Sequence, residues 1–358
     1  MPISTQTFGL TPARIAKYKG EILAHAEPQE LLSRDGRQIK FPKNSSDTYV
    51  ARRFLPYGAS STNATTQNTF FPTADGDRGN VIVQAHLTAE GVTPLPESIV
   101  PMDVTVVMQQ YSCLYGFTDK TYDLYEDDIP KEMIKQVGER VTLVNELIMY
   151  GVLKGCTNQF YGGTGTTIAT VNGGITLGML RKIGKSLMAN HGKMVNSMLK
   201  PSANYGTDAV EAGFNVYINT DLRPDVRDLP GFIPAVKYAS GTPMEHEFGK
   251  CEEFRFMSSP DLPSFQNGGA AIGATGLYST TGVSIDVYPF IVTAQNAWSQ
   301  VAVRGKDSLA PTYLAPGQPS KSDPFGQRGY AGTIWWKAGM VENNGWMAVG
   351  NVGVKTLV

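Results

Sequence analysis

The stretch DIPKEMIKQVGERVTLVNELIMYGVLKGCTN, residues 128–158, decides the fold, because its apolar residues recur at helical spacing. Asp128 is suited to cap the N-terminus of a helix, since its carboxylate can accept hydrogen bonds from the free amides of the first turn. Pro130 falls in that first turn, where a missing N–H costs nothing. Gly155 is a typical stop signal. A helix of about 27 residues is roughly 40 Å long, so other elements must pack along it.

One face of this predicted helix is apolar, at spacings of three and four residues. The core face consists of Val137, Val141, Val144, Ile148 and Val152, and it is widened by Met133, Leu143 and Leu147. Five charged residues lie largely off that face: Lys131, Lys135, Glu139, Arg140 and Glu146. An ordinary core helix and a coiled-coil dimer helix both fit this pattern, although the second is interrupted by glycines. A membrane span does not fit, because polar residues interrupt every window of about 18 residues.

Composition leaves the class of protein open but limits it. With 358 residues, one large or two ordinary domains are expected. The net charge of −1 gives no overall attraction to nucleic acid. Residues 1–57 hold nine Lys or Arg against five Asp or Glu, whereas residues 58–128 hold two against ten. The two segments are therefore expected to have different surroundings or to contact each other.

Cysteine usage and the first residues predict a cytoplasmic product. Cys113, Cys156 and Cys251 are far apart and form no CxxC pair, so we expect reduced, buried thiols. The first twenty residues contain no apolar run typical of a secretory signal.

The segments before the long helix are predominantly extended. Residues 1–38 are interpreted as an arm with little apolar surface of its own. Two extended runs, the second with a strand at 103–111, flank a Ser/Thr/Asn/Gly-rich tip, which predicts a long two-stranded arm. Such an arm is marginal alone in water, so it requires a partner surface.

The segments after the long helix alternate between helices and strands. A second amphipathic helix is predicted at 176–191, capped by Thr176 and ended by Gly192. Strands are predicted at 215–219, 250–258 and 286–294, with a short helix at 224–229. Asn344-Gly345 predicts a type I′ turn in a C-terminal hairpin. The outline is an α+β fold.

Motifs that carry catalysis are weak in this sequence. Gly184-Lys185-Ser186 resembles the end of a phosphate loop, but Gly178 is one residue too far away and the segment lies within a predicted helix. His246 and Cys251 lie among acidic residues and suggest a loose metal site, although a solvated acidic segment explains them more simply. The acidic residues 126–128 also suggest a cation site, although negative charge that stabilises a helix N-terminus explains them more simply. No GxSxG elbow occurs. We therefore predict no catalytic residue, cofactor or metal.

The basic residues of the N-terminal region form the one candidate contact surface. They are Arg14, Lys17, Lys19, Arg34, Arg37, Lys40 and Lys43. Contact with nucleic-acid phosphates and contact with the acidic segment of a neighbouring subunit are both open interpretations.

The order of elements resembles that of the major capsid proteins of tailed bacteriophages, with the Hong Kong ninety-seven (Johnson) fold. Within that group the sequence resembles the branch of the N4-like podoviruses. The resemblance covers about residues 30–358 and is carried by four phrases. They are MDVTVVMQQYSCLYGFTDKTYDL, NVYINTDLRPDVRDLPGF, KCEEFRFMSSPDL and DVYPFIVTAQNAWSQVAVRG.

The resemblance implies a division of the chain into domains. An N-terminal arm (1–38) precedes an extended loop (39–118, tip about 58–97). A peripheral domain (119–160) contains the spine helix 128–158, and an axial domain (161–240) follows. Residues 241–262 add a peripheral strand, 263–312 an insert and a return to the axial domain, and 313–358 the C-terminal peripheral strands.

The resemblance also implies a structural function in the virion capsid, for a protein made in the host bacterial cytoplasm. The expected partners are copies of the same chain in pentamers and hexamers, scaffold, portal and decoration proteins, and packaged double-stranded DNA, with no membrane. A soluble α+β hydrolase or ligase with an unrecognised site is the alternative.

Overall fold

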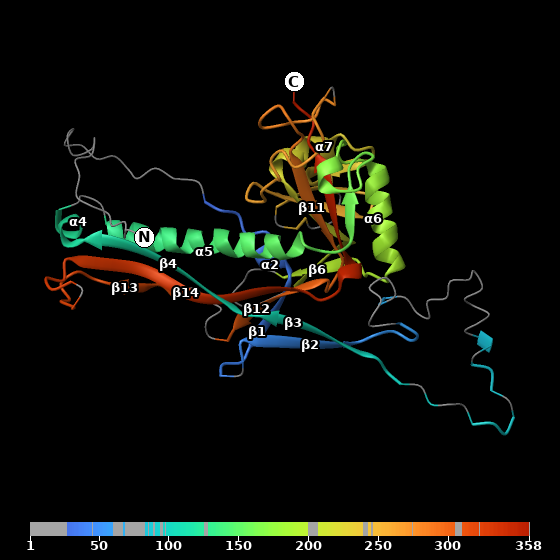
Figure 1. The fold of residues 1–358 in the computed structure, drawn as a ribbon, viewed down its shortest axis with the longest axis horizontal. Helices are drawn as coiled ribbons and strands as arrows, with labels where there is room; N and C mark the ends of the chain where they lie inside the picture. Colours follow the sequence, from blue (N-terminus) through green and yellow to red (C-terminus); the bar gives the residue numbers. More distant parts are fainter. Residues whose placement is uncertain are drawn as a thin grey trace.

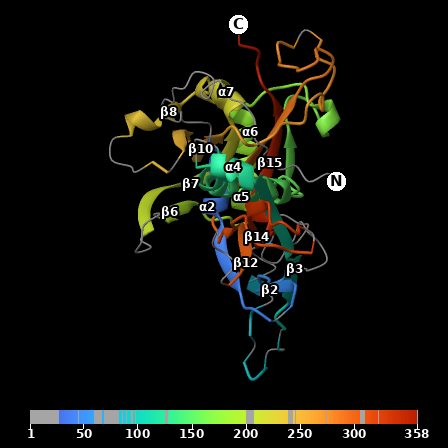
Figure 2. The same cartoon turned by 90° about the vertical axis from the view of Figure 1, so that its left-hand side faces the viewer.

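The computed structural model describes most of the chain between residues 27 and 357. The residues that it does not describe are 1–26, 45, 60–66, 69–82, 85, 89, 94–95, 97, 125–127, 200–206, 239–242, 245, 274, 305–309, 322 and 358. The fold is α+β, with a long helix and three sheets (Figures 1 and 2).

The long helix α5 (Ile129–Leu153) lies along a five-stranded sheet, the first sheet. Asp128 caps it as predicted, because its side chain accepts a hydrogen bond from the N–H of Lys131. The helix ends at Leu153, before the predicted end at 158, because the chain turns at 154–155 to form β5 (Gln159–Tyr161). The strands of the first sheet are β1 (Arg37–Phe41), β4 (Gln109–Thr118), β12 (Trp298–Val303), β13 (Thr312–Leu314) and β14 (Arg328–Val341).

The second sheet has eight strands and stands at the C-terminal end of α5 (Figure 1). Their order is β5-β15-β11-β7-β10-β9-β8, with β6 paired to β7. Besides β5 they are β6 (Val195–Leu199), β7 (Thr207–Asn219), β8 (Phe232–Pro234), β9 (Glu247–Cys251), β10 (Phe254–Ser259), β11 (Val287–Thr293) and β15 (Met347–Gly353).

The second sheet is buried on both faces, as its uninterrupted apolar strands indicate. Phe214, Val216 and Ile218 of β7 face one layer, together with α6 (Leu177–Ala189) and α7 (Arg223–Arg227). Tyr217, between them, points to the opposite face and shares a cluster with the last turns of α5. The two clusters place this sheet between α6 and the end of the long helix.

A third, two-stranded sheet pairs β2 (Thr48–Phe54) with β3 (Pro101–Val107). The predicted strand 103–111 is extended but not continuous, because Met108 is buried and its N–H donates to the carbonyl of Asp47 at a break between two sheets. The chain passes there from the β2–β3 ladder into β4, which pairs with β14. The remaining short helices are α2 (Leu32–Asp35), α4 (Asp119–Leu124), η1 (Ile168–Thr170), η2 (Thr220–Leu222), η3 (Ala235–Lys237) and η4 (Asn344–Trp346).

The predicted C-terminal hairpin is wrong. A type I′ turn needs positive φ at both central residues, and neither Asn344 nor Gly345 has it. Instead, Asn343 accepts a hydrogen bond from the N–H of Gly345 and caps η4. The flanking strands then separate, β14 into the first sheet and β15 into the second.

The predicted strand 250–258 is two antiparallel strands, β9 and β10, joined through Glu252 with φ of 51°. Both pair within the second sheet. The sheets thus group residues 247–259 with β7, which differs from the predicted grouping of 241–262 with the long helix. The second helix begins after Thr176 as predicted, and His191 with φ of 56° lies beyond its end.

Candidate assembly surfaces

The core face of α5 contacts the first sheet through its middle turns. Val137 and Val141 are buried in a cluster with Cys113 and Trp335, and Val144 packs against that cluster. Ile148 and Val152 are half-buried. The buried positions change near the end of the helix, where Met149, Tyr150 and Leu153 enter the cluster under the second sheet. The helix therefore joins the two sheets through two different faces.

Glu146 is buried on the side of α5 opposite Val137, since nine residues at about 100° each give a rotation of roughly 180°. Its side chain is 1% exposed. One carboxylate oxygen accepts the N–H groups of Leu31 (3.0 Å) and Leu32, and the other accepts the N–H and hydroxyl of Ser33 (both 2.9 Å). The long helix thus holds the N-terminal segment, here residues 31–33, by four hydrogen bonds to one buried carboxylate.

A basic side chain lies near that buried carboxylate. Burial lowers the pKa of Lys337, and the negative charge of Glu146 acts in the opposite direction. Sequence reasoning placed Glu146 off the core face and missed its role, because the partners lie more than 110 residues earlier in the chain.

The basic residues predicted as a contact surface are only partly in the described region. Arg14, Lys17, Lys19 and the side chain of Arg34 lie outside it. Arg37, Lys40 and Lys43 lie on β1 and the turn after it, and all three are exposed. Arg37 pairs with Glu342 at 3.5 Å. Among the described strands β1 pairs only with β12, so these residues mark one edge of the first sheet.

The β2–β3 ladder has one covered face and one exposed face. Tyr49 and Val106 pack on the cluster that contains Phe41 and Met108. On the opposite face, Val50, Phe54 and Val107 are 50%, 65% and 48% exposed.

An ion pair crosses that exposed face. Arg52 binds Asp103, directly opposite in register, through two hydrogen bonds of 2.7 and 2.9 Å. This contact lowers the pKa of Asp103. A two-stranded ladder with an apolar outer face is marginal in water, so this surface is suited to contact with another chain.

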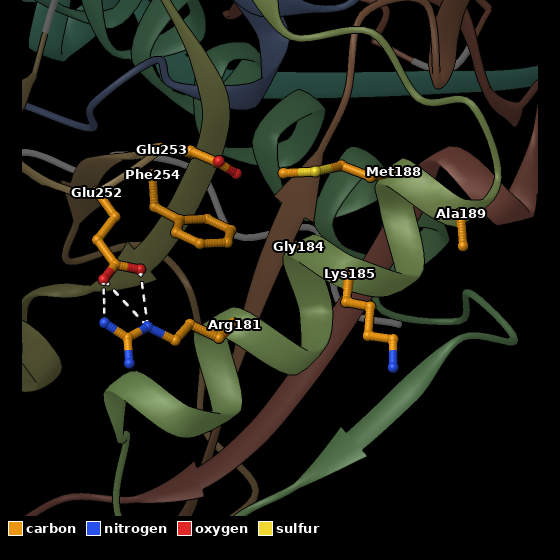
Figure 3. A pocket seen from close by; sticks show the side chains of 8 residues that line it. All are labelled: Arg181, Gly184, Lys185, Met188, Ala189, Glu252, Glu253 and Phe254. Atoms are coloured by element: carbon orange, nitrogen blue, oxygen red, sulfur yellow. Dashed lines mark hydrogen bonds and ion pairs between the residues drawn. The ribbon is translucent and has the colours of Figure 1, made fainter.

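An open hollow of about 550 Å³ lies beside α6, lined by that helix and the β9–β10 turn (Figure 3). Its best-defined contact is a bidentate pair between Arg181 and Glu252, which raises the pKa of Arg181 and lowers that of Glu252. Lys185 points outward from the helix in the same view. Gly184-Lys185-Ser186 thus lies inside α6, as the sequence predicted, and not in a loop that could surround a phosphate.

The groups considered for metal chemistry are occupied in other ways. Glu247 is buried and binds the hydroxyl of Tyr238 and the N–H of Met244, with Arg255 at 3.7 Å. It is therefore a structural carboxylate and not part of a solvated acidic surface. The described residues contain no group of three or more His, Cys, Asp or Glu that could hold a metal ion. Likewise, no described helix is long and apolar enough to cross a membrane.

Comparison with known proteins relates this arrangement to phage capsids. No protein-family model matches the sequence. The major capsid protein of Pseudomonas phage KPP21 is 22% identical over an alignment of 262 residues, and the match covers 68% of this chain. The chain spans 65% of the length of that relative.

Solved capsid structures match over almost the whole chain. The capsid of Ralstonia phage GP4 matches with a TM-score of 0.61 at 11% identity, over 99% of this chain and 100% of that one. The capsid asymmetric unit of cyanophage Pam1 matches with a TM-score of 0.54 at 12% identity, over 98% and 100%. At identities this low, the structural matches show the fold alone. The chain has the α+β fold of phage capsid subunits, which the sequence resemblance predicted.

Proposed function

We propose that this chain is a major capsid protein, which self-assembles into the icosahedral shell of a tailed bacteriophage around double-stranded DNA. The supporting observation is the match to the GP4 capsid subunit, which extends over both chains almost completely. A match of that extent supports an overall subunit architecture like that of a capsid protein. The function then lies in contacts between subunits and not in a reaction.

In this proposal the first sheet with α5 is the peripheral domain, and the second sheet with α6 is the axial domain. The β2–β3 ladder is the base of the extended loop, and residues 1–38 are the N-terminal arm. The exposed apolar face with Val50, Phe54 and Val107 supports a loop that lies over a neighbouring subunit. Many such contacts, each of modest free energy, add up to a stable shell.

The finer expectations are also part of the proposal. The four quoted phrases favour the N4-like podovirus branch. Scaffold, portal and decoration proteins are proposed partners besides other copies of the chain. Arg37, Lys40 and Lys43 form an exposed basic edge, which supports either non-specific contact with packaged DNA or contact with an acidic neighbour.

Deletion of the loop tip tests the proposal. The purified parent and a variant lacking residues 58–97 are compared by sedimentation velocity and by negative-stain electron microscopy. We expect the parent to form particles tens of nanometres across, and the variant to unfold cooperatively but to form no stable shell. A parent that remains a monomer at every concentration, or a variant that assembles equally well, contradicts the proposal.

A further inference from the structure

One described piece of the long connection between β2 and β3 is docked on the body of the subunit. Asn68 is only 8% exposed. Its amide forms a reciprocal pair with the amide of Asn343, with distances of 2.8 and 2.6 Å. Next to it, Gln67 accepts a hydrogen bond from the guanidinium of Arg53 at 2.9 Å.

The docking site is a small polar socket, which we call the amide socket and define as Asn190, Asn343 and Gly345. Asn343 is itself 4% exposed, and the amide oxygen of Asn190 lies 3.5 Å from the Asn68 nitrogen. A Cβ at Gly345 would lie 2.1 Å from that same nitrogen. Because Gly345 does not have positive φ, glycine is needed there for space and not for the turn.

Several described apolar side chains of the return limb are exposed. Val83, Leu87, Val92 and Ile99 are 61%, 68%, 60% and 73% exposed. In Figure 1 the described parts of this limb lie away from both large sheets. Several apolar side chains exposed along one limb are suited to contact with another molecule.

The limb and the docked segment belong to one connection, so a neighbour that draws the limb towards itself would also draw the docked segment out of the socket. The NH₂ group of Asn343 would then lose the acceptor that it has in this structure, while its oxygen keeps the N–H of Gly345. An unpaired buried donor is costly. A second copy of the chain carries the same Gln67–Asn68 segment and restores every lost hydrogen bond, which makes exchange of identical elements a low-cost route to association. About 13 residues separate Phe54 from Asn68, enough for an extended reach of roughly 45 Å.

We propose that in the assembled shell the amide socket receives the Gln67–Asn68 segment of a second copy, and that the contact within one chain is its unassembled form. This inference rests on the proposed capsid function. It identifies a partner and a binding site for one piece of the loop. It also assigns a role to Gly345, which leaves room for the incoming amide.

Two variants with one added cysteine each separate exchange from contact within a chain. One chain carries Gln67→Cys and the other carries Asn344→Cys, whose position is exposed beside the socket. The three native thiols are buried, and burial raises their pKa values, so they react slowly. The chains are mixed, assembled, isolated as particles by sedimentation, and treated with a short bismaleimide. A covalent dimer of the two variants can form only between chains.

We expect that dimer as the main product in particles, and a crosslink within one chain when the double variant is treated before assembly. Adding Gly345→Ala to the Asn344→Cys chain should reduce the dimer at least about tenfold, because the new methyl group fills the socket. Gly151→Ala is the matched control, since a Cβ there meets nothing within 4 Å.

Two outcomes overturn the inference while the capsid function stands: particles that yield no mixed dimer, or a Gly345→Ala dimer equal to that of the Gly151→Ala control. Absence of particles before the crosslinker is added overturns the capsid function and this inference together.

Discussion

Replacing Glu146 with Gln should detach the N-terminal segment from the long helix. The carboxylate accepts four hydrogen bonds, from the amides of Leu31, Leu32 and Ser33 and from the Ser33 hydroxyl. Glutamine keeps one acceptor oxygen but directs an NH₂ group at a backbone N–H, so at least one buried donor loses its partner. It also removes the charge that strengthens the remaining bonds.

The expected loss of unfolding free energy is about 2–4 kcal/mol. A hydrogen bond to a charged group contributes about 1.5–3 kcal/mol, and an orphaned buried donor costs about 1–3 kcal/mol. Local release of residues 31–33 limits the loss of unfolding free energy, because this segment can detach while the sheets stay folded. Detachment also takes Leu31 and Leu32 out of the core.

Two measurements check this prediction: urea unfolding, and hydrogen exchange of a peptide covering residues 27–36. Glu139→Gln on the same helix is the matched control, because Glu139 pairs with Lys135, one turn away on that helix, at 3.7 Å. We expect Glu146→Gln to reduce both the midpoint and the protection of the amides at 31–33, and Glu139→Gln to change neither strongly. Equal effects of the two variants, or unchanged protection at 31–33, would refute the reasoning.

Three further predictions concern the core, a partly buried acid and the loop. Val137→Asp should prevent folding because it buries an unpaired carboxylate. Leu147→Asp on the same helix, where the leucine is 39% exposed, should still unfold cooperatively in thermal melts followed by circular dichroism. Two equally stable variants would show that the face with Val137 is not core. Burial raises the pKa of Asp35 from 3.8 to about 6, so the folded state binds the proton of this carboxyl group more tightly than the unfolded state does. The contribution of Asp35 to the free energy of unfolding therefore falls as pH rises between those two values, by at most about 3 kcal/mol. Asp35→Asn should remove that dependence in urea titrations, and a variant with the parent's pH profile contradicts the assignment. Phe54→Ser on the exposed loop face should change the free energy of unfolding by less than about 0.5 kcal/mol but reduce the yield of particles in sedimentation. The control Phe325→Ser, at a position that is 83% exposed, should leave the particle yield unchanged. Equal yields of the two variants would count against the loop surface as a contact.

The parts of the fold that were predictable depend on short-range chemistry. Asp128 and Thr176 each cap a helix through an amide three residues ahead, so the local sequence is sufficient to locate both N-termini. The apolar run of β11 is bounded by polar residues and was located to within a residue at each end.

The failures with the largest effect on the fold and the site involve partners that are distant in sequence. The strands around Asn344-Gly345 have a typical turn signal, but β14 pairs with β4 and β15 pairs with β11, so no hairpin forms. Glu146 has the spacing of a solvent-facing residue, and only the returning N-terminal segment makes it a buried acceptor. The docking of Asn68 on Asn343 joins residues 275 positions apart, and no local pattern announces it.

Electron cryomicroscopy of the assembled protein tests the central claim most directly. We predict closed icosahedral shells in which this fold occupies every pentamer and hexamer position, with the β2–β3 loop of each subunit lying on a neighbour. Particles without icosahedral order, or a protein that stays monomeric at all concentrations and with every candidate partner, would contradict the account.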